Sequence, residues 1–266
     1  MAVSLYCFIF PGKFPNYMKR IVVLFVLLTT YAIGFAQETE DYSRITKETL
    51  AYEEYRVKIT RPPYGLEKVL GLISRIKETD EENLVLNQKD YMALSLREKF
   101  TYHMIHAETY SQNCDATPPV PESEKKVFGQ LPNAFDDFSW SERQGNFLEA
   151  NRDSVIALMS ESISRSNHIG INYKIAIEDL NGREMIPLLI STYNKDHKDK
   201  DILTLLMLLM KKNEYAPFMT SASYKKLYAA PNQESSYRAY LICNTANEEL
   251  IIQRATAFYN GLPKKH

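Results

Sequence analysis

Two histidines lie three residues apart within the segment 102–108, Tyr-His-Met-Ile-His-Ala-Glu. In a helix, His103 and His106 would project from neighbouring positions on one face, where their imidazoles could share a zinc ion. Glu108 would lie on another side of that helix, so we do not expect it to be a ligand of the same ion. Further ligands would have to come from other segments, where the candidates are Asp136, Asp137 and His168.

The histidine pair has two interpretations. A zinc ion held by His103 and His106 could activate water, which is the chemistry of a metal-dependent hydrolase. Two histidines at this spacing in an aromatic-rich helix are more often packed residues whose hydrogen bonds are satisfied within the protein. We predict no cofactor, and zinc bound by His103 and His106 is the alternative.

A second polar segment, Asn194 to Asp201, contains three aspartates that could suggest calcium. The EF-hand loop needs glycine at its sixth position and glutamate at its twelfth, where this chain has Asp199 and Leu205. Interleaved lysines also cancel the acidic field. We therefore expect a solvated turn between two helices.

Other common catalytic patterns are missing from the sequence. It has no Gly-rich phosphate loop, no Gly-x-Ser-x-Gly, no His-Glu-x-x-His and no paired-cysteine zinc site. With nine glycines in 266 residues, a dinucleotide-binding fold is not expected. The eighteen tyrosines could recognise carbohydrate or peptide, although the same residues serve at the edges of protein cores; the tyrosines considered for this role are Tyr52, Tyr55, Tyr64, Tyr91 and Tyr102.

The amino end has the pattern of a cleavable secretory signal. Lys19 and Arg20 precede the apolar run Ile21–Ile33, and Gly34-Phe35-Ala36 supplies small residues at the −3 and −1 positions of a cleavage site. We expect cleavage after Ala36, removal of residues 1–36, and export to the periplasm or beyond the cell; an uncleaved anchor helix is the alternative. The upstream residues 1–17 have no role in such a signal and could be an extension before the true start at Met18.

Removal of the signal takes away three of the 32 Lys and Arg residues and none of the 33 Asp and Glu residues, which leaves a net charge of −4. Basic residues are dispersed, so neither nucleic acid nor anionic lipid is an expected partner. No membrane span is expected after cleavage. Cys114 and Cys243 are the two cysteines left, and export would permit a disulfide between them; two buried free thiols are the alternative.

Helices must position most of the candidate residues named above, because apolar residues recur at helical spacing along the mature chain. Ser139 and Glu142 have the spacing of a capping box at a helix start. The Asn181-Gly182 pair fits a helix end better than a hairpin turn, since both flanks keep the helical period. The expected helices include 66–76, 89–112, 155–163, 173–180, 185–193, 202–210, 235–245 and 247–259.

Prolines interrupt this pattern between residues 115 and 134. We therefore expect an N-terminal helical part over 37–114 and a C-terminal helical part over 135–266. The segment 115–134 is either a loop packed on the surface or a linker between two lobes. The fold class that follows is all-α, built from packed helical hairpins.

Residues 172–213 resemble a HEAT-type helical repeat: a helix, the Asn181-Gly182 turn, the sequence Ile186-Pro187-Leu188-Leu189, and another buried helix. The resemblance covers about forty residues. It implies a short α-α superhelix that binds other proteins and does no chemistry of its own. The sequence around Ala36 is likewise similar to secretory signals of the Bacteroidota.

Three classes of function are compatible with these observations. The favoured one is an exported protein-interaction or structural module of the cell envelope, with a protein as its partner. The second is the hydrolase based on His103 and His106. The third is a carrier of a hydrophobic small molecule, which would need a dry cavity near Leu205 and Met207.

Overall fold

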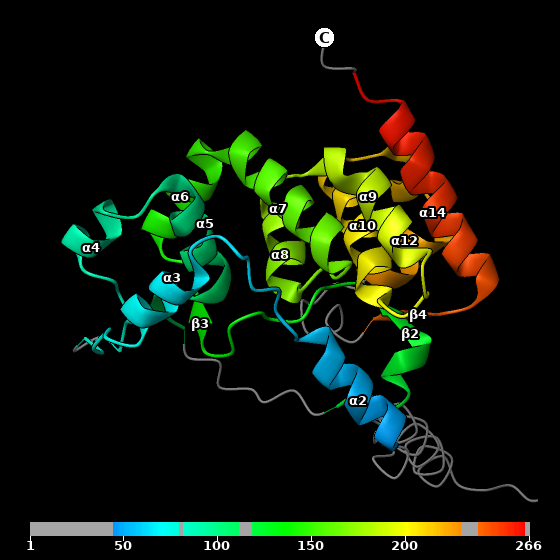
Figure 1. Ribbon diagram of the computed structural model, residues 1–266. Helices are drawn as coiled ribbons and strands as arrows, with labels where there is room; N and C mark the ends of the chain where they lie inside the picture. The colour runs from blue at the N-terminus through cyan, green and yellow to red at the C-terminus, as the bar shows by residue number, and fades with distance from the viewer. Residues whose placement is uncertain (1–44, 80–81, 112–118, 230–238, 264–266) are drawn as a thin grey trace, which may run out of the picture. The chain divides into compact units, whose positions relative to one another are not determined.

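Helices dominate the computed structural model, which describes residues 45–79, 82–111, 119–229 and 239–263 (Figure 1). The prediction of an all-α fold of packed helices is confirmed. The expected signal peptide, 1–36, lies outside the described residues. In chain order the elements are α2 (Lys47–Arg56), α3 (Leu66–Ile73), α4 (Gln88–Met92), α5 (Leu96–Ile105), β1 (Thr109–Tyr110), η3 (Ser123–Lys125), β2 (Lys126–Phe128), β3 (Phe138–Ser139), α6 (Glu142–Ala150), α7 (Arg152–Ser166), α8 (Ile171–Asp179), η4 (Arg183–Met185), α9 (Ile186–Tyr193), α10 (Lys200–Lys212), α11 (Ala216–Met219), α12 (Ala222–Tyr228), β4 (Tyr240–Ile242) and α14 (Thr245–Asn260).

Helix α10 lies at the centre of the larger hydrophobic core. It contacts α8, α9, α14 and β2, and Figure 1 shows α8, α10 and α14 beside one another. Every residue from Asp201 to Met210 is buried, which confirms the buried helix predicted at 202–210. Leu205 and Met207 are fully enclosed by this core. In the part of the chain that is described, no helix is both long enough and apolar enough to cross a membrane.

Side-chain caps fix where several helices begin. Ser95 and Glu98 form a capping box at the start of α5, and Ser141 and Gln144 form one at the start of α6. The sequence places the second box at Ser139 and Glu142, two residues too early. Ser139 instead pairs with Thr109 in the small β1–β3 sheet.

The single long helix predicted over 89–112 is wrong. Ser95 caps a new helix, so α4 and α5 are separate, and α5 ends at Ile105. Near that end, Trp140 Nε1 donates to the carbonyl of His103 at 2.7 Å, and Asn172 Nδ2 donates to that of Met104 at 2.5 Å. These distant side chains satisfy carbonyls that a longer helix would have used, and the backbone becomes extended at His106.

The predicted helix end at Asn181-Gly182 is confirmed. Helix α8 ends at Asp179, Asn181 adopts a positive φ of 48°, and η4 leads directly into α9, which carries Pro187 in its first turn. Helices α8, α9 and α10 therefore span the segment that resembles a HEAT-type repeat. The type of repeat stays a prediction.

The helix predicted over 235–245 is wrong where that segment is described, because it contains strand β4. Residues 230–238 lie outside the described residues. Strand β4 pairs antiparallel with β2, with Val127 opposite Leu241. Strand β2 belongs to the Pro-rich segment, contacts α10, and accepts a hydrogen bond at the carbonyl of Phe128 from Thr204 Oγ1 at 2.8 Å. Residues distant in sequence complete this ladder, so helical spacing alone could not reveal it.

The segment 58–60 is held against the start of α8 by four polar contacts. The backbone N–H groups of Ile171 and Gly170 donate to the carbonyl of Lys58 (3.1 Å) and to Oγ1 of Thr60 (2.7 Å). Asn172, which has no exposed surface, accepts from the N–H of Thr60 at 2.9 Å and donates to its carbonyl at 2.8 Å. A Cβ atom at Gly170 would overlap the Thr60 backbone, so this approach requires glycine.

Replacing Asn172 by alanine should lower the free energy of unfolding by about 3–5 kcal/mol, because three buried backbone groups would lose their partner. Urea denaturation followed by circular dichroism would measure the change. Asn146, exposed on α6, is the matched control, and its replacement by alanine should change stability by less than about 1 kcal/mol. Equal effects of the two substitutions would contradict the bridging role of Asn172.

Candidate functional site

The side-chain amide of Gln144 is completely buried, and its partners fix its orientation. Its Oε1 accepts from the backbone N–H groups of Glu108 (3.0 Å) and Ser141 (3.1 Å), and these groups can only donate. Its NH₂ group must therefore point the other way. There Nε2 donates to the carbonyl of His106 at 2.8 Å and lies 3.0 Å from Nδ1 of His103.

This arrangement fixes the tautomer of His103. Because the Gln144 amide nitrogen can only donate, Nδ1 must accept, and the ring proton lies on Nε2, 3.1 Å from the hydroxyl oxygen of Tyr91. Burial, followed by the positive charge of Arg143, lowers the pKa of His103 to about 3. The imidazole is neutral at pH 7, and both of its nitrogens already have protein partners.

His106 is also held by the protein. Its Nε2 donates to the carbonyl of Leu84 at 2.6 Å, and burial lowers its pKa. Among the described residues, no group of three or more His, Cys, Asp or Glu side chains is arranged to hold a metal ion. The geometry favours packed histidines with satisfied hydrogen bonds, and a zinc site at His103 and His106 stays a prediction without structural support.

Glu108 occupies the centre of this polar network, a position that the sequence analysis missed. The carboxylate is 1% exposed and accepts from the hydroxyls of Tyr102 (2.7 Å) and Ser141 (2.5 Å) and from the guanidinium of Arg143. Burial, followed by the hydrogen bond to Glu108, raises the pKa of Tyr102. The expected position of Glu108 on the far side of a helix is wrong because α5 has already ended.

The acidic segment 194–201 is only partly the solvated turn that its sequence predicts. Asp196 is exposed, but Asp199 and Asp201 are 4% and 1% exposed. Asp201 forms a bidentate ion pair with Arg56, at 2.9 and 3.0 Å, and Asp199 Oδ1 lies 2.7 Å from Lys174 Nζ. Two of the three aspartates in this segment therefore form buried ion pairs, and the cations of both pairs come from other helices.

In the part of the chain that the structure describes, neither Cys243 nor the candidate tyrosines form a reactive site. Burial, followed by the hydrogen bond to Glu248, raises the pKa of Cys243 to about 12, so this thiol is protonated at pH 7. Cys114 lies outside the described residues, and a disulfide with Cys243 stays a prediction.

The tyrosines considered for ligand recognition do not form one open surface, because four of them are buried: Tyr52, Tyr64, Tyr91 and Tyr102.

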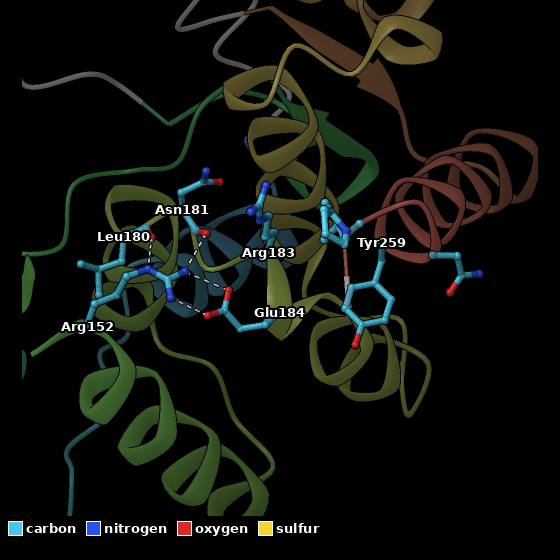
Figure 2. Close-up of a pocket in the computed structure, with 9 residues that line it drawn as sticks. Arg152, Leu180, Asn181, Arg183, Glu184 and Tyr259 are labelled. Atoms are coloured by element: carbon cyan, nitrogen blue, oxygen red, sulfur yellow. Dashed lines mark hydrogen bonds and ion pairs between the residues drawn. The ribbon is translucent and has the colours of Figure 1, made fainter. Parts of the chain in front are cut away.

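A concave site lies where α7 begins, α8 ends and α14 ends, and is called here the α7–α14 groove (Figure 2). Its volume is about 880 Å³. Both apolar and polar residues line it. The residues that line it are Arg152, Leu180, Asn181, Arg183, Glu184, Tyr259, Asn260, Leu262 and Pro263.

Arg152 organises one side of the groove. Its Nε and Nη2 donate to the carbonyls of Leu180 (2.9 Å) and Asn181 (3.0 Å), which lie just beyond the last turn of α8. Its Nη1 and Nη2 also bind both carboxylate oxygens of Glu184, at 2.6 and 2.9 Å (Figure 2). These contacts hold Arg152 in place, and Glu184 offsets its charge. Arg183, in contrast, is exposed, and its guanidinium contacts the neutral Oδ1 of Asn213 at 3.3 Å.

The neutral state of His103 should make stability depend on pH. Its pKa is lowered on folding, so only the unfolded chain takes up this proton as pH falls below about 6.5, and stability is lost progressively until the pH nears the folded value of about 3. In His103→Gln, the unfolding free energy should fall less steeply between about pH 6 and 4, by up to ~1.4 kcal/mol per pH unit. Urea denaturation at several pH values measures both slopes. Parallel pH dependences in the two proteins would contradict a neutral, buried His103.

Comparisons with known proteins do not supply a function for this site. No protein-family model matches the chain, no curated protein matches it, and no solved structure matches it. The function must therefore be inferred from the geometry of the described residues.

Proposed function

We propose that this protein is an exported interaction module that binds an acidic, extended segment of a partner protein in the α7–α14 groove. The observation that carries the proposal is the groove itself, about 880 Å³ in volume, on a scaffold of packed helices. A site of this size is large enough for several side chains of a peptide. Export is inferred from the secretory pattern in residues 18–36 and places the partner in the cell envelope.

The chemistry of the lining residues supports a peptide as the ligand. Tyr259 offers an aromatic surface, and arginine and tyrosine are enriched among the residues that dominate binding energy in protein interfaces. The amide of Asn260 carries both donors and an acceptor, as a peptide backbone does. Leu262 adds apolar surface for the partner's side chains.

The charge at the edge of the groove favours an acidic segment. The charge of Arg152 is offset by Glu184, whereas Arg183 forms no ion pair among the described residues and keeps most of its five N–H donors for a ligand. Carboxylates of a partner would complement the guanidinium of Arg183 and speed the partner's association.

A photocrosslinking amino acid at Asn260 tests the proposal in cells that export the protein. We expect an adduct of discrete mass whose crosslinked peptide is rich in Asp and Glu. Adding Arg183→Glu should reduce the adduct about tenfold or more, because charge reversal replaces attraction by repulsion. Asn146, an exposed asparagine on α6, is the matched control position. The same adducts at both positions, or none at Asn260, would overturn the proposal.

A further inference from the structure

Arg152 presents a bidentate carboxylate site at one side of the α7–α14 groove, and the chain's own Glu184 fills that site (Figure 2). The two oxygens of Glu184 accept from the guanidinium of Arg152, at 2.6 Å from Nη1 and 2.9 Å from Nη2. Paired N–H bonds of this kind are the geometry by which arginine recognises the carboxylate of a ligand. Glu184 therefore occupies a position that a carboxylate of a partner could take.

The guanidinium of Arg152 is also held by two contacts that do not involve Glu184. Its Nε donates to the carbonyl of Leu180 at 2.9 Å, and its Nη2 donates to the carbonyl of Asn181 at 3.0 Å. Both bonds would remain if the side chain of Glu184 turned away. The guanidinium would keep its orientation, and a site oriented in advance costs a ligand little ordering.

Glu184 can leave this site at small cost. The side chains of Arg152 and Glu184 are 30% and 37% exposed, so water screens their attraction and can hydrate the released carboxylate. Ion pairs with such exposure add little net stability. An incoming carboxylate would also restore the two bonds to the guanidinium that Glu184 gives up.

Asp153 is a second carboxylate beside Arg152, but it does not fill the bidentate site. One of its oxygens lies 3.3 Å from Nη1, and its side chain is 78% exposed. Glu184 binds both nitrogens at shorter distances. Asp153 therefore offers a control of the same charge at the same arginine.

We propose that Glu184 is an intramolecular competitor, which the acidic segment of the partner displaces so that its carboxylates bind both Arg152 and Arg183. Arg183 directly precedes Glu184 in the sequence and lines the same groove. A ligand gains from displacing Glu184 only if it has a carboxylate to put in its place. The competition therefore selects segments with at least two acidic residues, one for each arginine. This inference rests on the proposed function, because it concerns the same groove and the same class of partner.

The test is a two-dimensional NMR titration of residues 37–266 with a blocked peptide of alternating glutamate and alanine residues, at constant ionic strength. We expect saturable shift changes at the amides that line the groove, and binding at least threefold tighter in Glu184→Gln than in the wild type. Asp153→Asn removes the same charge beside the same arginine and should tighten binding less than twofold. Equal tightening in the two variants would indicate a general effect of charge and overturn the inference.

A double substitution separates displacement from charge. Arg152→Gln combined with Glu184→Gln removes both the site and its competitor and leaves the net charge of the groove unchanged. This variant should bind the peptide at least threefold more weakly than the wild type; equal affinity would contradict a role for Arg152 in binding. Because the variant also loses the bonds to Leu180 and Asn181, Arg152→Lys combined with Glu184→Gln is a second test. It keeps the positive charge without the bidentate geometry, and should bind at least threefold more weakly than Glu184→Gln alone.

The inference and the proposed function fail in different ways. If neither the wild type nor Glu184→Gln shows a saturable change at the groove, acidic-peptide binding there is wrong, and the competition with it. If the wild type binds the peptide but Glu184→Gln binds no more tightly, the groove is a peptide site and the role of Glu184 alone is refuted.

Discussion

The bridge made by Asn172 is the interaction on which the rest of the structure depends. One buried amide satisfies both backbone groups of Thr60 and the carbonyl of Met104, and so joins the segment after α2, the end of α5 and the start of α8. Because α5 ends there, the following residues run extended and bring Glu108 to Gln144. Only a short stretch of chain separates α2 from Thr60. Because Thr60 is held at the start of α8, the end of α2 lies beside the α7–α8 connection. The polar network around Glu108 is therefore a consequence of this bridge.

Buried ion pairs fix the position of α10 within this frame. Asp199 and Asp201 lie two residues apart at the start of the helix and bind cations from α8 and α2, respectively. Such pairs add little net stability, since the charges lose their hydration, but breaking one leaves a charge without a partner. The two ion pairs instead specify one position of α10, because a shift of this helix by one residue would separate both pairs at once. The apolar surface of α10 alone could pack in several registers, since it is buried on all sides.

Local patterns in the sequence predicted the fold class and several helices, but the candidate site depends on contacts between distant residues. Helix α10 and the end of α8 were predicted correctly because their periodicity and the Asn181-Gly182 signal are local. The prediction of one long helix over 89–112 was wrong because the side chains that bind the last carbonyls of α5 are distant in sequence. Trp140 and Asn172 lie 37 and 68 residues away from the carbonyls they bind. His103 and His106 were identified as a pair, but the state of His103 is set by Gln144, 41 residues further on. No spacing within one segment encodes such a partner.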